Sequence, residues 1–129
     1  MESVTPQDTY AHIVGAFAFA HSWWDVDSVE GAVHPIDDVA DDWKVSGFAD
    51  DPYGEEGAFE YAFELTHADV MRALRICADK DQRQAKYVSE LCSKESLRML
   101  LGNADGCDFD AKRADEVVQV AVFGKVHYG

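Results

Sequence analysis

The chain has five histidines, and histidine is the side chain best suited to bind a metal ion or to transfer a proton. His12 and His21 stand nine positions apart in a stretch that we expect to be helical. At about 100° per residue they lie on opposite faces of that helix, so they cannot bind one metal ion within a single chain. His67 directly follows Thr66, where a helix N-terminus would lower the pKa of its imidazole. As a surface residue beside a cap, His67 would have no chemical role, and we predict no metal site.

The carboxylates also fail to match known catalytic or calcium-binding spacings. Asp105, Asp108 and Asp110 cluster around a glycine, but their order differs from that of an EF-hand loop. Glu60 and Glu64 share one face of a predicted strand at a separation of about 13 Å, which is too long for a glycosidase pair. The sequence contains neither of the common phosphate-binding glycine motifs, no G-x-S-x-G and no H-E-x-x-H. We therefore expect no catalytic residue and no cofactor.

The acidic residues are distributed very unevenly along the chain, whose formal net charge is -14. Residues 1–70 contain sixteen acids and one base, Lys44, for a charge of -15, whereas residues 71–129 contain nine acids and ten bases, for a charge of +1. Proteins that bind nucleic acid directly need Lys and Arg to neutralise phosphates, so the first half is not expected to bind DNA or RNA. A partner with a basic surface, or self-association, fits this charge better.

The run from Asp37 to Glu56 concentrates this negative charge, and it has three interpretations. Its carboxylates can keep the protein soluble, can imitate phosphate spacing and occupy the nucleic-acid cleft of a basic protein, or can attract divalent cations weakly. The residues that would contact a basic partner are Asp37, Asp38, Asp41, Asp42, Asp50, Asp51, Glu55 and Glu56.

The N-terminal stretch from Thr5 to Trp24 is predicted to be a buried helix. Thr5 suits the N-cap, Pro6 the first helical position and Asp8 the capping box, and no formally charged residue lies between Asp8 and Asp25. Such a helix packs on two sides. One stripe is expected to face the core, and it consists of Tyr10, Ile13, Val14, Phe17, His21 and Trp24. The opposite side, with His12, Phe19 and Trp23, is either a subunit interface or is covered by the C-terminal helix.

After an acidic connection over residues 25–42, the pattern predicts a β-hairpin over about residues 43–65. Trp43, Val45 and Gly47 alternate with Lys44, Ser46 and Phe48 in its first strand. In the second strand the inward residues are expected to be Phe59, Tyr61, Phe63 and Leu65, with Ala58, Glu60, Ala62 and Glu64 facing outward.

The rest of the chain is predicted to form three or four helices. Thr66 with Asp69 marks the start of the first, Asp81 that of the second and Ser93 that of the third. The inward sets are Val70, Met71, Leu74, Cys77 and Ala78, then Ala85, Val88, Leu91 and Cys92, then Leu97, Leu100 and Leu101 before Gly102. Residues 111–123, capped by Asp110 and ended by Gly124, suit a helix better than the alternative strand through Val118, Val120 and Val122.

Together these elements predict an α+β fold in a single domain over residues 1–129, with the N-terminal helix and the hairpin packed against the other helices. The N-terminus is acidic rather than basic, and the apolar run Ile13–Ala20 is too short to span a bilayer. We therefore expect a cytoplasmic protein without a membrane partner. Cys77, Cys92 and Cys107 are an odd number without a C-x-x-C pair, which favours reduced thiols.

Two functions remain open from the sequence. The first is a non-enzymatic interaction or regulatory protein whose acidic half binds a basic partner, with a nucleic-acid-mimicking inhibitor as its most specific form. The second is a small ligand-binding module or enzyme, with an aromatic pocket between the first helix and the hairpin. The residues of that pocket would be His21, Trp24, Trp43, Tyr61 and His67.

Overall fold

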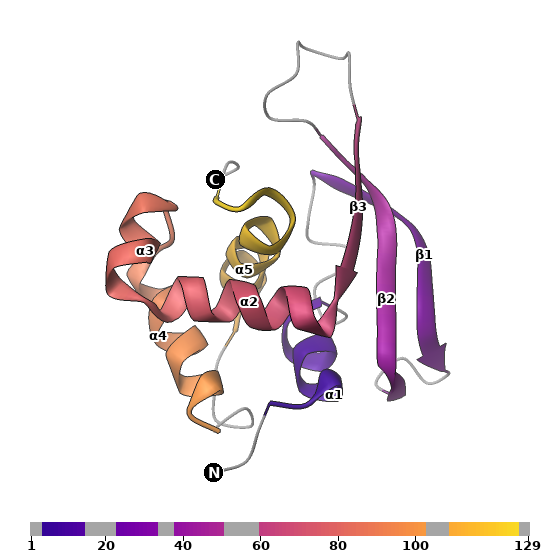
Figure 1. Cartoon of the computed structure of the whole chain (residues 1–129), viewed down its shortest axis with the longest axis horizontal. Helices are drawn as coiled ribbons and strands as arrows, with labels where there is room; N and C mark the ends of the chain where they lie inside the picture. Colours follow the sequence, from indigo (N-terminus) through magenta and orange to yellow (C-terminus); the bar gives the residue numbers. More distant parts are fainter. Residues whose placement is uncertain (1–3, 15–22, 34–37, 51–59, 103–108, 127–129) are drawn as a thin grey trace.

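A three-stranded antiparallel sheet with helices on one side forms the protein, which confirms the predicted α+β fold (Figure 1). The computed structural model describes residues 4–14, 23–33, 38–50, 60–102 and 109–126. In chain order the elements are α1 (Pro6–Thr9), the π-helical turn η1 (Tyr10–Val14), β1 (Trp24–Val33), β2 (Asp38–Asp50), β3 (Glu60–Thr66), α2 (His67–Ala78), α3 (Lys80–Ala85), α4 (Glu90–Leu100) and α5 (Ala111–Phe123).

The N-terminal helix begins as predicted but does not extend to Trp24. The Thr5 hydroxyl accepts a hydrogen bond from the Asp8 N–H at 3.1 Å, and the Asp8 carboxylate accepts one from the Thr5 N–H at 3.0 Å. This capping box starts α1, and Ile13 and Val14 of η1 are buried, as expected. Trp24, however, is the first residue of β1, so the prediction of one helix to that residue is wrong. Phe17, Phe19 and His21 lie outside the described residues.

The sheet has the strand order β1-β2-β3, and both pairs of neighbours are antiparallel. The predicted hairpin is the β2–β3 pair, in which Val45 lies opposite Leu65 and Phe48 opposite Ala62. The prediction of a loop over residues 25–42 is wrong, because this segment contains β1 and the start of β2. Its acids and glycine suggested a turn, but pairing with the already extended β2 satisfies its backbone groups.

Side chains alternate across β2 and β3 as the sequence predicts. Trp43, Val45 and Leu65 are buried on the face that meets the helices, while Phe48 and Glu64 are exposed on the other. Phe63 is also buried, whereas Phe59 and the side chain of Tyr61 lie outside the described part of the structure. One face of the sheet is therefore core and the other meets solvent.

The caps of α2 and α5 are the predicted Thr66 and Asp110, and the left-handed Gly124 ends α5. Residues 111–123 are thus helical. The caps predicted for the two intervening helices are wrong: Asp79 caps α3 and Ser89 caps α4. The Asp79 carboxylate accepts hydrogen bonds from the N–H groups of Asp81 and Gln82, which places its helix start two residues earlier than expected.

The four-residue shift in the start of α4 also changes which side of this helix is buried. The inward residues are Cys92, Ser93, Ser96 and Met99. Leu91, Leu97 and Leu101 face outward, with exposed fractions of 53%, 48% and 60%, and Ala85 of α3 is also exposed. The prediction that these four residues belong to the core is therefore wrong, because α4 packs against α2 through its small side chains.

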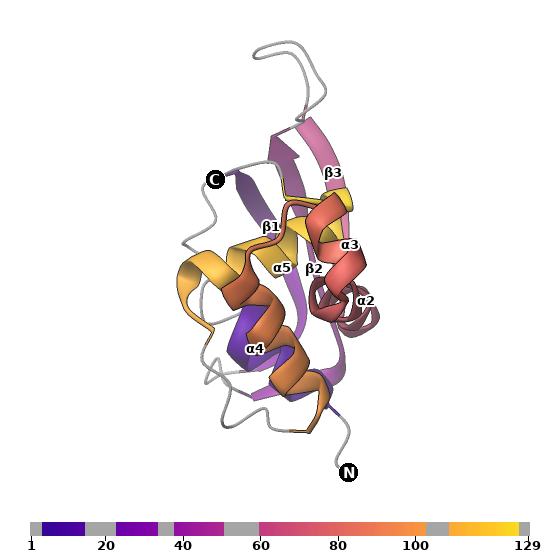
Figure 2. The same ribbon diagram turned by 90° about the vertical axis from the view of Figure 1, so that its left-hand side faces the viewer.

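The core fills the space between the sheet and the layer formed by α2 and α5 (Figures 1 and 2). Its fully buried members include Ile13, Leu65, Leu74, Val117 and Val118. Cys77 and Cys92 are buried free thiols between α2 and α4, and a hydrogen bond with Cys77, together with burial, raises the pKa of Cys92. Within the ranges described above, no helix has the length and apolar character needed to cross a membrane.

Candidate protein-interaction surface

None of the helices that the structure describes covers the outer face of the sheet, because α2, α3, α4 and α5 all lie on its other side (Figures 1 and 2). The side chains described on this face include Glu30, Lys44, Ser46, Phe48, Ala62 and Glu64. We refer to these six residues as the open sheet face. Glu30 and Glu64 are well exposed, and Phe48 is 43% exposed on the same face.

A single cation crosses the open sheet face and joins its three strands. The Lys44 ammonium of β2 lies 3.3 Å from the Glu30 carboxylate of β1 and 3.5 Å from the Glu64 carboxylate of β3. The hydrogen bond and charge of Glu30, followed by the charge of Glu64, raise the pKa of Lys44. Lys44 is the only base among residues 1–70, and both of its carboxylate partners are acids of the same half. The three groups together still carry one net negative charge.

Next to the ion pairs of Lys44 with Glu30 and Glu64, β2 bulges away from β1. Glu30 pairs with Lys44 and Ala32 pairs with Val39, so Gly31 alone lies opposite residues 40–43. Gly31 has φ +81°, and a Cβ there would come within 3.0 Å of the Trp43 Cα. Only glycine fits this close approach without strain. The bulge projects Asp41 and Asp42 into solvent at the edge of the open sheet face.

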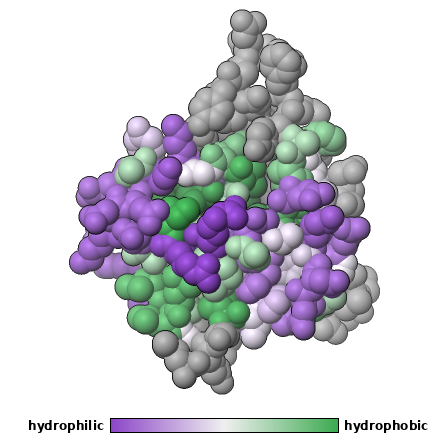
Figure 3. Space-filling view, viewed as in Figure 1, coloured by the Kyte–Doolittle hydropathy of each residue, from purple (hydrophilic) through white to green (hydrophobic). Residues whose placement is uncertain are grey.

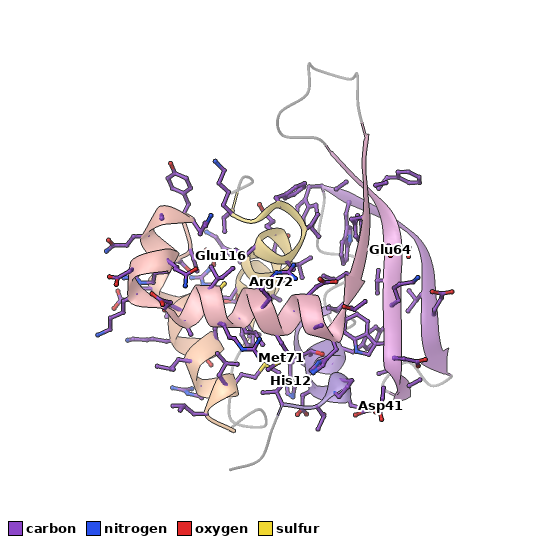
Figure 4. All side chains as sticks on the ribbon, in the orientation of Figure 1. His12, Asp41, Glu64, Met71, Arg72 and Glu116 are labelled. Carbon is purple, nitrogen blue, oxygen red and sulfur yellow. The ribbon has the colours of Figure 1, made fainter. Side chains whose placement is uncertain are left out.

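Helix α1 holds the bulge in place through three hydrogen bonds. The side-chain amide of Gln7 donates to the Val39 carbonyl at 3.0 Å and to the Asp41 carboxylate at 2.8 Å. From the other direction, the indole N–H of Trp43 donates to the Pro6 carbonyl at 2.8 Å. Because these bonds fix residues at both ends of the bulge, its two aspartates project from a firmly held backbone. Figure 4 shows Asp41 at the lower end of the sheet.

A shallow depression of about 280 Å³ lies on the sheet beside Glu64. Its lining residues are Ser46, Gly47, Phe48, Ala62, Phe63 and Glu64. It combines an exposed aromatic ring, a carboxylate and a hydroxyl, and it contains none of the residues predicted for an aromatic pocket. A side chain that carries an apolar stem and a cationic head fits such a lining.

Of the eight acids predicted to contact a partner, the structure describes the side chains of two. Asp41 and Asp42 are exposed on the bulge. Asp38 and Asp50 are the first and last residues of β2, with only their backbone described. The remaining four, Asp37, Asp51, Glu55 and Glu56, lie outside the described residues.

The predicted pocket residues make separate contacts. The ring of Trp43 is buried edge-on against Tyr10 at 5.4 Å, and Trp24 stacks on Phe63 at 5.4 Å. His67 begins α2, and its Nδ1 lies 2.9 Å from the hydroxyl of Thr9. His21 and the side chain of Tyr61 lie outside the described part.

Of the three residues predicted for a subunit interface, the structure describes two, Trp23 and His12. Trp23 is only 3% exposed, because α5 covers it: its ring lies 5.1 Å from that of Phe123, and its indole N–H donates to the Asp115 carboxylate. His12 is half-buried, and Phe19 is outside the described residues. Trp23 therefore belongs to the fold, which is the second of the two roles considered for this side of the N-terminal segment.

Sequence reasoning missed three residues of this region. Glu30 and Phe48 belong to the open sheet face, and Gln7 holds the adjoining bulge. The alternating pattern places Phe48 on the same side of its strand as Lys44 and Ser46, but no sequence feature marks it as part of a site. Lys44 was a usable signal, since a single base within an acidic half must lie near carboxylates. Its pairing with Glu30 depends on a strand register that only the tertiary structure supplies.

The described residues contain no group of three or more His, Cys, Asp or Glu side chains placed to hold a metal ion. Comparisons with protein-family models, with curated proteins and with solved structures find no match to this chain. The surface geometry is therefore the basis for a functional assignment.

Proposed function

We propose that this is a cytoplasmic, non-enzymatic interaction protein that binds a basic protein partner through its open sheet face and the adjoining bulge. The observation that carries the proposal is the sheet face that no described helix covers, on which Phe48 and the carboxylates of Glu30 and Glu64 are all exposed. Asp41 and Asp42 extend the same negative surface.

The composition of this surface suits protein recognition. Carboxylates steer a basic partner towards the sheet and determine which partners are rejected, while burial of an aromatic ring supplies affinity. Lys44 offsets part of the repulsion between Glu30 and Glu64 and holds them in position across the strands. Partner arginines or lysines would pair with these carboxylates and lay their apolar stems on Phe48.

In its most specific form the surface imitates nucleic acid. A DNA-binding domain presents Lys and Arg side chains that are spaced to meet phosphates, and carboxylates on a firm backbone can take the place of those phosphates. The support for this form is that the bulge is held by Gln7 and Trp43 and that the half of the chain carrying it has a charge of -15.

The proposal is tested by biolayer interferometry of the full chain against a panel of immobilised basic DNA-binding domains, with polylysine as the probe for non-specific charge attraction. We expect binding to at least one domain that weakens steeply with salt and that competes with duplex DNA. Absence of salt-sensitive binding to every domain, or binding to polylysine alone, would contradict the proposal.

Two variants with the same net charge locate the binding surface. Glu30→Gln with Glu64→Gln removes two negative charges from the sheet, and Gln84→Lys with Ala85→Lys adds two positive charges to exposed positions of α3. We expect the sheet variant to bind about tenfold more weakly. The α3 variant should lose less than half of the binding free energy that the sheet variant loses. Phe48→Ser should weaken binding by about tenfold with little change in its salt dependence, because it removes apolar contact rather than charge.

A further inference from the structure

Helix α4 has an inverted distribution of side chains. It buries Ser93 and Ser96 against the rest of the chain, and it exposes Leu91, Leu97 and Leu101 to solvent. A surface helix normally does the reverse, because burying a leucine removes a large apolar side chain from water, whereas burying a serine contributes little. Exposed leucines gathered on one side of a helix offer an apolar surface that another molecule can cover.

The outward leucines form a stripe along one side of α4. At about 100° per residue, Glu90, Leu91, Lys94, Leu97, Arg98 and Leu101 all fall within the outer half of the helix. We call these six residues the α4 leucine stripe. Figure 3 shows hydrophobic side chains gathered at the lower left, over the lower end of α4. Figure 2, which views the molecule from the helical side, shows α4 in front of α1.

The charge on the α4 leucine stripe determines which partner fits it. Within the stripe, Glu90 offsets one of the two cations, Lys94 and Arg98, and Arg98 also lies 3.4 Å from Glu95 of the same helix. With Glu95 included, the outer part of α4 has no net charge. The acidic open sheet face is on the opposite side of the molecule (Figures 1 and 2). A second copy can therefore approach through α4 while the two acidic surfaces stay as far apart as the fold allows.

The stripe is also complementary to itself in one arrangement. When two copies of α4 pack antiparallel about a two-fold axis at Lys94, Leu91 of each copy lies opposite Leu97 of the second copy. The same register places Glu90 of each copy opposite Arg98 of the second copy. We propose that the protein forms a two-fold symmetric dimer through the α4 leucine stripe, with antiparallel α4 helices. Lys94 at the axis lowers the affinity and specifies the register, as one charged residue does in the core of a coiled coil.

A contact made by one helix from each subunit is at the small end of specific interfaces, so we expect a reversible dimer rather than an obligate one. The test is sedimentation equilibrium of the full chain from about 1 µM to about 1 mM, the range in which interfaces of this size dissociate. The mass should rise from 14.3 kDa towards twice that value as concentration increases. A chain that remains monomeric at the highest concentration overturns the proposal.

Three variants test the face and its register. Leu97→Glu places a charge in the stripe and should abolish the dimer. Circular dichroism at the lowest concentration, where the unchanged chain is also monomeric, should report an unchanged melting temperature because this side chain is already exposed in the monomer. Phe48→Glu adds the same charge to the open sheet face and should leave dimerisation unchanged. Lys94→Leu should tighten the dimer by about tenfold. If Phe48→Glu rather than Leu97→Glu removes the dimer, association occurs through the sheet and the proposal is wrong.

A mixing experiment tests the antiparallel arrangement. Glu90→Arg alone places like charges at both ends of the interface, and so does Arg98→Glu alone, so each variant should be monomeric by itself. An equimolar mixture restores opposite charges at both ends and should form a heterodimer. A mixture that remains monomeric, while the unchanged chain dimerises, excludes this register. Because these positions are on the helical side, their results are independent of binding to a basic partner.

Discussion

His67, the first residue of α2, occupies a site that favours its neutral form. Its Nδ1 lies 2.9 Å from the hydroxyl of Thr9, which also donates to the Pro6 carbonyl at 3.1 Å. Since that hydroxyl has one hydrogen, the imidazole Nδ1–H donates to it. Burial lowers the pKa of His67 below its ordinary value of 6.5, and the positive charge of Arg75 acts in the same direction while Asp8 opposes both.

This shift predicts how stability depends on pH. Because the pKa of His67 is lower in the folded protein, the unfolded chain takes up its proton first as the pH falls, and folding stability decreases below about pH 6.5 until the folded-state pKa is reached. Urea unfolding between about pH 7.5 and about pH 5.5 should show a larger loss for the unchanged protein than for His67→Gln, whose amide can still donate to Thr9. Parallel curves for the two proteins would show that His67 does not contribute.

Gly31 is a second residue whose role follows from its immediate contacts. An added Cβ would lie 3.0 Å from the Trp43 Cα and 3.3 Å from the Ala40 Cβ, and φ is +81°. Gly124 has a similar φ of +86°, but nothing lies within 4 Å of an added Cβ. We expect Gly31→Ala to lower the free energy of unfolding by about 2–4 kcal/mol and Gly124→Ala by only about 1 kcal/mol, as measured by chemical denaturation. Equal losses would mean that the close approach to Trp43 carries no cost.

Among the elements, α4 begins at an N-cap residue that is hydrogen-bonded to a side chain of α5. The Ser89 hydroxyl accepts from the Cys92 N–H at 3.2 Å and donates to the buried Glu116 carboxylate at 2.7 Å, which also accepts from the Ser89 N–H at 2.8 Å. Glu116 therefore joins α5 to the N-terminus of α4, where a negative charge is favourable. Figure 4 shows Glu116 on the helical side, away from Glu64 on the sheet.

Ser89→Ala is expected to cost more than the loss of an ordinary cap. It removes the cap and also deprives a buried carboxylate of a hydrogen bond, so we expect a loss of about 2–3 kcal/mol. Asp110→Ala, the matched change at the exposed cap of α5, should cost only about 1 kcal/mol. Guanidinium titrations of both variants give this comparison. A similar cost for the two changes would indicate that the Glu116 contact adds nothing to the cap.

The elements that sequence analysis located correctly are those specified by local interactions. The capping boxes of Thr5 with Asp8 and of Thr66 with Asp69 join residues three positions apart, so they can be recognised from the sequence. Strand β1 was missed because its extended form depends on pairing with β2 across a bulge. The outward leucines of α4 were assigned to the core because apolar periodicity identifies an apolar stripe without indicating which molecule covers it.

The candidate surface was predictable to a similar extent. The charge difference between the two halves of the chain follows from the sequence alone, and it is the basis of the prediction that the acidic half meets a partner. Which acids share one face could not be predicted, because Glu30 and Glu64 are brought together by the register of three strands. The projection of Asp41 and Asp42 depends on the bulge opposite Gly31, which involves contacts between residues far apart in the chain.

At the scale of the whole molecule, the uneven charge predicts how salt affects stability. Negative charges of the first half repel one another, and screening shortens the range of this repulsion from about 30 Å at 0.01 M salt to about 8 Å at 0.15 M. We therefore expect the melting temperature to rise by a few degrees over that range, equivalent to about 1 kcal/mol. Asp41→Asn with Asp42→Asn should reduce this rise, since both acids lie in the crowded half. Asp81→Asn with Glu90→Gln, which gives the same net charge but alters the nearly neutral half, should leave the rise intact. A melting temperature that falls with added salt would contradict this expectation. It would mean that ion pairs such as those of Lys44 stabilise the fold by more than the repulsion among the acids destabilises it.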